Sequence, residues 1–139
     1  MDSPQDVVAA WCILTDLKVI DPTCGSGAFL FAALKILQNL YSAVIDAAVA
    51  HARTARHAEL DAILEAVREH PNHDYFILKH ATLSNLYGVD LMHEAVEIAR
   101  LRLFLKLVAS IDKRSDLEPL PDLDFNQVGQ RPRRRPGRR

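Results

Sequence analysis

The 139-residue sequence is poor in cysteine, tryptophan and glycine, with two, one and five of them respectively. Two cysteines, Cys12 and Cys24, are too few for a disulfide framework, and the sequence has no CxxC pair that would suggest a zinc site. The six histidines have no recognisable metal-ligand spacing, so no metal is predicted. The start lacks the layout of a signal peptide, and no uninterrupted apolar run is long enough to span a bilayer. We therefore expect a soluble protein, without a membrane partner, in the reducing cytoplasm.

The chain has almost no excess of charge of one sign, because its formal net charge is -1. This value conceals a division, since six of the 17 basic residues are arginines within 131–139. The other 11 basic residues face 18 acidic ones, which leaves the rest of the chain at -7. This part of the chain therefore has no net positive charge with which to attract a phosphate backbone. We expect 127–139 to be a disordered arginine-rich tail. The alternative is a tail that adds salt-dependent DNA contacts.

What is present is an ordinary globular composition, 49% hydrophobic and 25% charged, in a length that suits one domain. Short β-rich runs alternate with longer helical runs, and this order favours an α/β layer with an incomplete parallel sheet. Strands are predicted at 17–20, 85–90 and, as the start of a third, 123–126. Helices are predicted at 7–14, from 28 past Tyr41, at 60–67, around 76–78 and at 94–110. A break between two helices is predicted at 51–56. The helical residues at about 41–80 are interpreted as an insertion.

The first candidate site is the turn between the first strand and the long helix. Gly25 and Gly27 permit backbone conformations and close approaches that a Cβ would forbid. Exposed N–H groups at the helix start can receive a carboxylate or phosphate, and Asp21 at the strand tip can accept from an ammonium group. A ligand with an amino and a carboxylate end, such as the methionine part of S-adenosylmethionine, suits this pairing.

The second candidate is Asp90, at the end of the next strand. A carboxylate there can bind both ribose hydroxyls of an adenosine, as in dinucleotide-binding folds. Simpler roles compete with these assignments. The succession of a strand, a turn with two glycines and a helix also occurs in α/β proteins that bind no ligand at that turn. Asp90 alone is more often a helix N-cap, and Cys24 is more often a small buried residue than a nucleophile.

Three stretches resemble the motifs of adenine-specific DNA methyltransferases, above all the large enzymes of phage-defence and restriction–modification systems. The first, 21–30, reads Asp-Pro-Thr-Cys-Gly-Ser-Gly-Ala-Phe-Leu. The second is Asn-Leu-Tyr-Gly-Val-Asp at 85–90, followed by the helical residues 95–103. The third, 120–126, resembles the segment that leads into the family's next motif. The resemblance extends over 17–126.

The resemblance implies a partial Rossmann-like S-adenosylmethionine-dependent methyltransferase fold over 1–126. It implies a ribose contact from Asp90, an adenine contact from Leu91, and a methionine end surrounded by Asp21, Thr23, Cys24, Gly25 and Gly27. The family transfers the sulfonium methyl group to the exocyclic amine of an adenine flipped out of DNA. DNA, and the remaining half of such an enzyme, are therefore the expected partners.

The sequence departs from the family where the chemistry would occur, because it contains no Asn-Pro-Pro-Tyr motif. No catalytic residue is therefore assigned, and we expect the chain alone to be inactive. Two other functions remain open at this point. A nicotinamide-dependent oxidoreductase is weakened by Leu30, which stands where the dinucleotide fingerprint requires Gly or Ala. A non-catalytic interaction fragment would bind a protein, or nucleic acid through its arginine tail.

Overall fold

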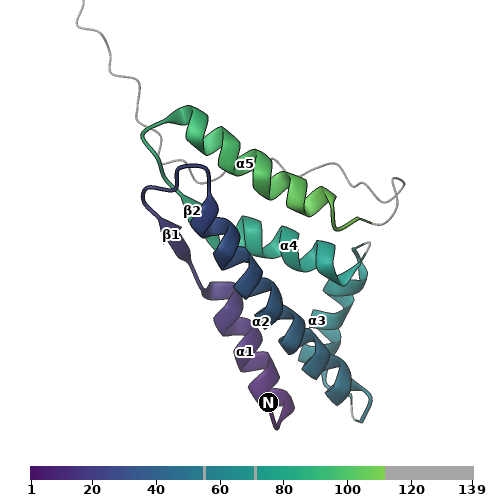
Figure 1. Cartoon of the computed structure of the whole chain (residues 1–139). Coiled ribbons are helices and arrows are strands. Elements are labelled where there is room, and N and C mark those ends of the chain that lie inside the picture. Colours follow the sequence, from purple (N-terminus) through teal and green to yellow (C-terminus); the bar gives the residue numbers. More distant parts are fainter. Residues whose placement is uncertain (55, 71, 112–139) are drawn as a thin grey trace, which may run out of the picture.

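The computed structural model describes residues 1–54, 56–70 and 72–111 (Figure 1). Five helices and two short strands follow one another in these residues. Their order is α1 (Pro4–Asp16), β1 (Val19–Asp21), α2 (Ala28–Ala52), α3 (Ala58–Arg68), α4 (His73–Ser84), β2 (Leu86–Gly88) and α5 (His93–Val108). All the predicted helices are present, and the predicted break at 51–56 separates α2 from α3. The possible strand at 123–126 and the tail at 127–139 lie outside the described residues.

Local signals account for where the elements begin and end. At the start of α1, Ser3 and Asp6 form a reciprocal capping box, and Pro4 occupies a first-turn position that does not need its N–H. At the start of α4, the Asn72 side chain accepts from the backbone N–H of Tyr75. Pro22 directly follows β1 and cannot donate to a ladder, so the strand ends at Asp21.

The two strands are parallel neighbours, with Val19 opposite Leu86 and Asp21 opposite Gly88. Both strands therefore finish at the same edge of the sheet. This arrangement confirms the predicted α/β character at the coarse level of helices around a small parallel sheet. A parallel pair needs a long crossover between its strands, and here α2, α3 and α4 supply it.

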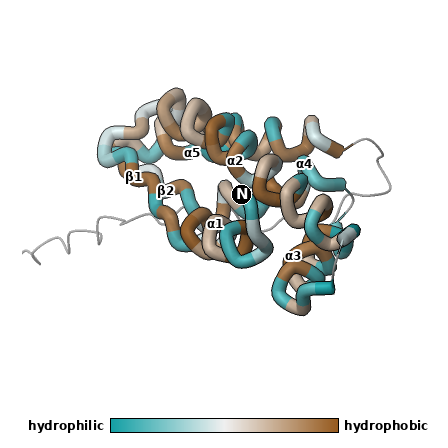
Figure 2. Tube along the Cα trace, turned by 90° about the horizontal axis from the view of Figure 1, so that it is seen from below, coloured by the Kyte–Doolittle hydropathy of each residue, from teal (hydrophilic) through white to brown (hydrophobic). Residues whose placement is uncertain are grey.

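Helix α2 is the centre of the core and packs against α1, α3, α4 and both strands. Figure 2 shows hydrophobic positions alternating with hydrophilic ones along the helices. Within the described residues, α2 is the one helix whose length and composition would suit a membrane span. Lys35 and Asp46 interrupt its apolar residues, which is why the sequence shows no uninterrupted run of that length. Its contacts on several sides are those of a central core helix.

The sequence of helix α5 is apolar around much of its circumference. Its apolar residues predict a helix packed between two layers, but only the face with Val96, Ala99, Leu103 and Leu107 is buried. This face packs toward α4. The opposite stripe, which contains Ile98, Leu101 and Leu105, is more than half exposed. Within the described residues, no second layer covers that stripe.

Candidate functional site

The site lies where β1 and β2 end side by side. Beyond the last paired residues, the backbone N–H of Val89 donates to Asp21 O at 2.9 Å, and Cys24 N–H donates to Val89 O at 3.0 Å. These two bonds continue the pairing of the strands into the following loops. The turn at 22–27 is therefore fixed to the segment that carries Asp90.

The Asp90 carboxylate joins the two loops directly. Its Oδ2 accepts from the Gly25 N–H at 2.8 Å, and its Oδ1 accepts from the Met92 N–H at 2.9 Å. The Met92 and Gly25 N–H groups hold the pKa of Asp90 below its usual value, because both bonds favour the charged form. A carboxylate can accept about four hydrogen bonds, so Asp90 keeps capacity for a ligand. It is not the N-cap of α5, since that position belongs to Met92.

The glycine turn needs its glycines for two different reasons. Gly25 has a φ of 50°, and a Cβ there would meet no atom within 4 Å. Gly27, the N-cap of α2, has a φ of 78°, and a Cβ there would lie 2.8 Å from the Cβ of Ala99. The open space beside Gly25 is available to a ligand, whereas Gly27 allows α5 to approach the turn.

The start of α2 supplies hydrogen-bond donors. Gly27 gives no side-chain cap, and the first N–H groups of a helix have no partner within the helix. The positive end of the helix dipole adds to their attraction for an anion. The chemistry of the donor set therefore fits the amino-acid end of S-adenosylmethionine, with N–H groups for the carboxylate and Asp21 for the ammonium group.

The structure brings six of the seven predicted residues into one corner. Asp21 accepts the Thr23 N–H through Oδ1 at 3.1 Å, and the residue is partly exposed beside the turn. Cys24 is only 6% exposed, so it contributes to the loop surface through its backbone. Leu91 differs from the others, because it follows Asp90 but is 89% exposed. No described residue encloses it, and its contact with an adenine ring stays a prediction.

The thiol of Cys24 is poorly suited to act as a nucleophile. Burial raises its pKa, and the negative charges of Asp90 and Asp21 raise it further. The thiolate is the reactive form of cysteine, so this environment suppresses reactivity. The predicted role of Cys24 as a small buried residue agrees with its position.

Three contributors escaped the sequence-based reasoning. Arg102 donates to Ser26 O at 3.0 Å and to Ser26 Oγ at 3.2 Å, which attaches α5 to the turn. Ala99 makes room for Gly27, and a Cβ at Gly88 would lie 2.8 Å from Leu30 Cδ1. All three lie within the second family-like stretch, 85–90 and 95–103, but the sequence does not name their partners.

Comparison with known proteins identifies the family of the chain. The family model for the DNA-methyltransferase domain of MmeI matches residues 3–117. A protein of Methanocaldococcus jannaschii, described as a "Putative type II restriction enzyme and methyltransferase", is 32% identical over 117 residues. That match covers 81% of this chain and 8% of the relative, so the chain spans a small part of the relative's length. No solved structure matches the chain significantly. The resemblance to restriction–modification methyltransferases is thus confirmed, and the chain belongs to the MmeI DNA-methyltransferase domain family.

Proposed function

We propose that the chain is the S-adenosylmethionine-binding part of an adenine-specific DNA methyltransferase. The observation that carries this proposal is the 2.8 Å hydrogen bond between Gly25 N–H and Asp90 Oδ2, at the ends of two paired parallel strands. It joins residues 65 positions apart. The hydrogen bond holds the glycine turn and the second carboxylate side by side, so that one ligand could reach both with its methionine end and its ribose.

Each part of the corner would recognise a different part of the cofactor. The N–H groups at the start of α2 would bind the methionine carboxylate, and Asp21 would accept from its ammonium group. Asp90 would accept from the ribose hydroxyls with the acceptor capacity that Gly25 and Met92 leave free. When bound, the cofactor supplies an electrophilic methyl group on a sulfonium.

Transfer of that methyl group to adenine requires further residues. A flipped adenine needs acceptors for its exocyclic amine and a stacking surface, and the sequence contains no Asn-Pro-Pro-Tyr motif to provide them. We therefore propose that this chain binds the cofactor but does not methylate DNA alone. DNA, and the polypeptide that carries the missing motif, are the proposed partners.

Titration calorimetry with S-adenosylmethionine tests the proposal. We expect binding by the unaltered chain, and a loss of about tenfold in affinity for Asp21→Asn, since one charge-assisted contact is removed. Asp46→Asn is the matched control, because Asp46 is exposed on α2 away from the turn. Binding of NADH without binding of S-adenosylmethionine would overturn the assignment, and so would equal losses in the two variants.

A further inference from the structure

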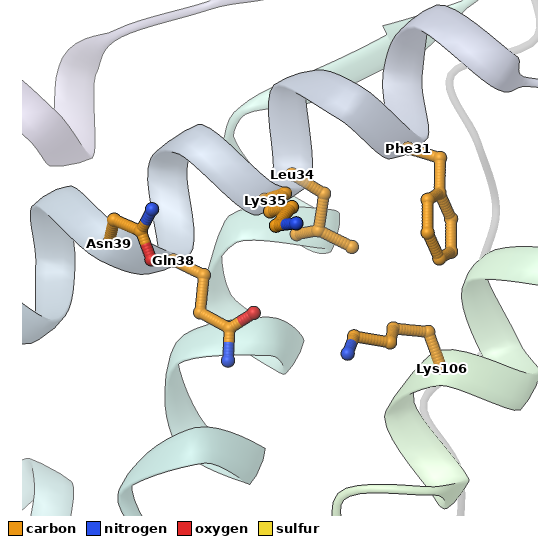
Figure 3. Close-up of a pocket in the computed structure, with 6 residues that line it drawn as sticks. All are labelled: Phe31, Leu34, Lys35, Gln38, Asn39 and Lys106. Carbon is orange, nitrogen blue, oxygen red and sulfur yellow. The ribbon is translucent and has the colours of Figure 1, made fainter.

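A pocket of about 270 Å³ lies between α2 and α5 (Figure 3). Its lining residues are Phe31, Leu34, Lys35, Gln38, Asn39 and Lys106. In Figure 3 the Lys106 side chain extends from α5 toward α2, and Gln38 projects from α2 on the other wall. Leu34 is buried, so the pocket combines an apolar base with polar walls.

Two of the residues that line this pocket are charged, and both carry a positive charge. Lys35 and Lys106 form no ion pair with any described residue, and neither has an acidic residue three or four positions away on its own helix. By contrast, Arg68 pairs with Glu65 at 3.5 Å and Arg100 pairs with Glu97 at 3.3 Å. The usual helical compensation of a basic residue by an acidic one is thus missing at the pocket.

A third cation, Arg102, lies near the two lysines of the pocket. Arg102 precedes Lys106 by one helical turn, and like charges at this spacing disfavour the helix. The Arg102 guanidinium lies 5.7 Å from the centre of the Phe31 ring, which also lines the pocket. The nearby carboxylate of Asp74 accepts from Gln38 Nε2 at 3.3 Å. Asp74 therefore holds one wall in place, while both lysines remain without a carboxylate partner among the described residues.

From this arrangement we propose that the pocket is a binding site for a phosphate group, separate from the cofactor corner. Two ammonium groups and two side-chain amides can donate to several oxygens of one anion, and lysine binds phosphate as a point charge. The anion would relieve the repulsion between cations on α5. Lys35 lies eight residues after Gly27, about 12 Å along the helix at 1.5 Å per residue, which places it away from the glycine turn. The phosphate belongs either to a DNA backbone or to a free ion.

Pyrophosphate and a short DNA duplex serve as probes of the whole chain. Pyrophosphate should shift the amide resonances of α2 and α5, and Lys35→Gln/Lys106→Gln should weaken its binding at least about tenfold. If the phosphate is that of DNA, the same double variant should lower the slope of log affinity against log salt by about 2, at ~0.9 per lysine. The matched control is Arg53→Gln/Arg68→Gln, which removes two exposed charges elsewhere.

The outcomes separate the two sources. Loss of pyrophosphate binding in the lysine variant alone supports a phosphate site, and a lowered DNA slope identifies the backbone as its source. Lys106→Arg keeps the positive charge at this position, so retention of pyrophosphate binding by this variant would support recognition by charge. The proposal fails if pyrophosphate shifts no resonance of α2 or α5, or if both double variants weaken equally. Because both lysines are exposed, circular-dichroism melting should show the lysine variant folded, and its S-adenosylmethionine affinity should be unchanged.

Discussion

Among single residues, the two glycines of the turn allow a matched comparison. Gly25→Ala should cost about 1–2 kcal/mol of unfolding free energy, since a left-handed backbone disfavours a Cβ. Gly27→Ala should cost at least about 2 kcal/mol more, because its Cβ would also collide with Ala99. Urea unfolding followed by circular dichroism measures both values. Equal losses would mean that α5 moves aside without cost, contrary to the close packing described above.

The two cysteines provide a second comparison at this scale. Cys24 is buried and the pKa of its thiol is raised, whereas Cys12 is exposed. We expect iodoacetamide at pH 8 to alkylate Cys24 at least about tenfold more slowly than Cys12 in the folded chain, since only the thiolate reacts. Peptide mass spectrometry measures the two rates. The difference should vanish in urea, and similar rates in the folded chain would contradict the buried position.

At the scale of elements, the amide of Asn85 connects segments that are distant in sequence. Its Nδ2 donates to Leu14 O and Leu17 O, each at 2.7 Å, and its Oδ1 accepts from the Tyr41 hydroxyl at 3.0 Å. The side chain thus ties the end of α1 and the residue that follows it to α2. Buried polar groups that lose such partners are costly.

We therefore predict that Asn85→Ala lowers the unfolding free energy by about 3 kcal/mol, because it strands several buried groups that each cost 1–3 kcal/mol. Denaturant unfolding checks the value. Asn39→Ala, at an exposed position of α2, should change stability by less than about 0.5 kcal/mol. A loss for Asn85→Ala no greater than that of the control would show that the buried network does not hold these elements together.

Helix α4 introduces a dependence on pH through His80, whose ring stacks with Trp11 and Phe76. Burial lowers the pKa of His80, and the charges of Lys18 and His70 lower it further. The folded state therefore binds this proton less readily than the unfolded state does. The contribution of neutral His80 to the unfolding free energy is therefore fully present above the pKa of the unfolded state, about 6.5. It is lost as the pH falls below that value toward the pKa of the folded state.

We expect the unfolding free energy to decrease between pH 7.5 and 5.5, and the decrease to be smaller in His80→Gln. Thermal or urea unfolding across this range gives the slope. His73→Gln is the control, because His73 is exposed at the start of α4, and it should keep the slope of the unaltered chain. An unchanged slope in His80→Gln would assign the pH dependence to other groups.

For the whole molecule, the exposed stripe of Ile98, Leu101 and Leu105 on α5 is the feature with the clearest consequence. Ile20 of β1 is also 62% exposed. Contiguous exposed apolar surface favours association. We predict that the chain self-associates as its concentration rises, and that replacing the three stripe residues by glutamine reduces this association. Sedimentation velocity provides the measurement, and a monomer at every concentration would contradict the prediction.

Much of the element pattern followed from the sequence, because its signals act over a few residues. The stop after Asp21 follows from Pro22, the start of α1 from Ser3 and Pro4, and the turn from Gly25 and Gly27. The description of α5 as a helix between layers was wrong for the described residues, since an apolar circumference does not reveal which neighbours are present. The site residues were assigned from their types and from the family resemblance, and their contacts with a cofactor stay a prediction.

The sequence by itself thus determined the local elements, the glycine turn and the membership of a methyltransferase family. Only the tertiary structure decided which distant residues meet: Asp90 with Gly25, Ala99 with Gly27, and Lys106 of α5 across a pocket from Lys35 of α2. The physical reason is that these contacts depend on how α2, α3 and α4 pack between the two strands. Packing is a property of many side chains together, and no short stretch of sequence encodes it.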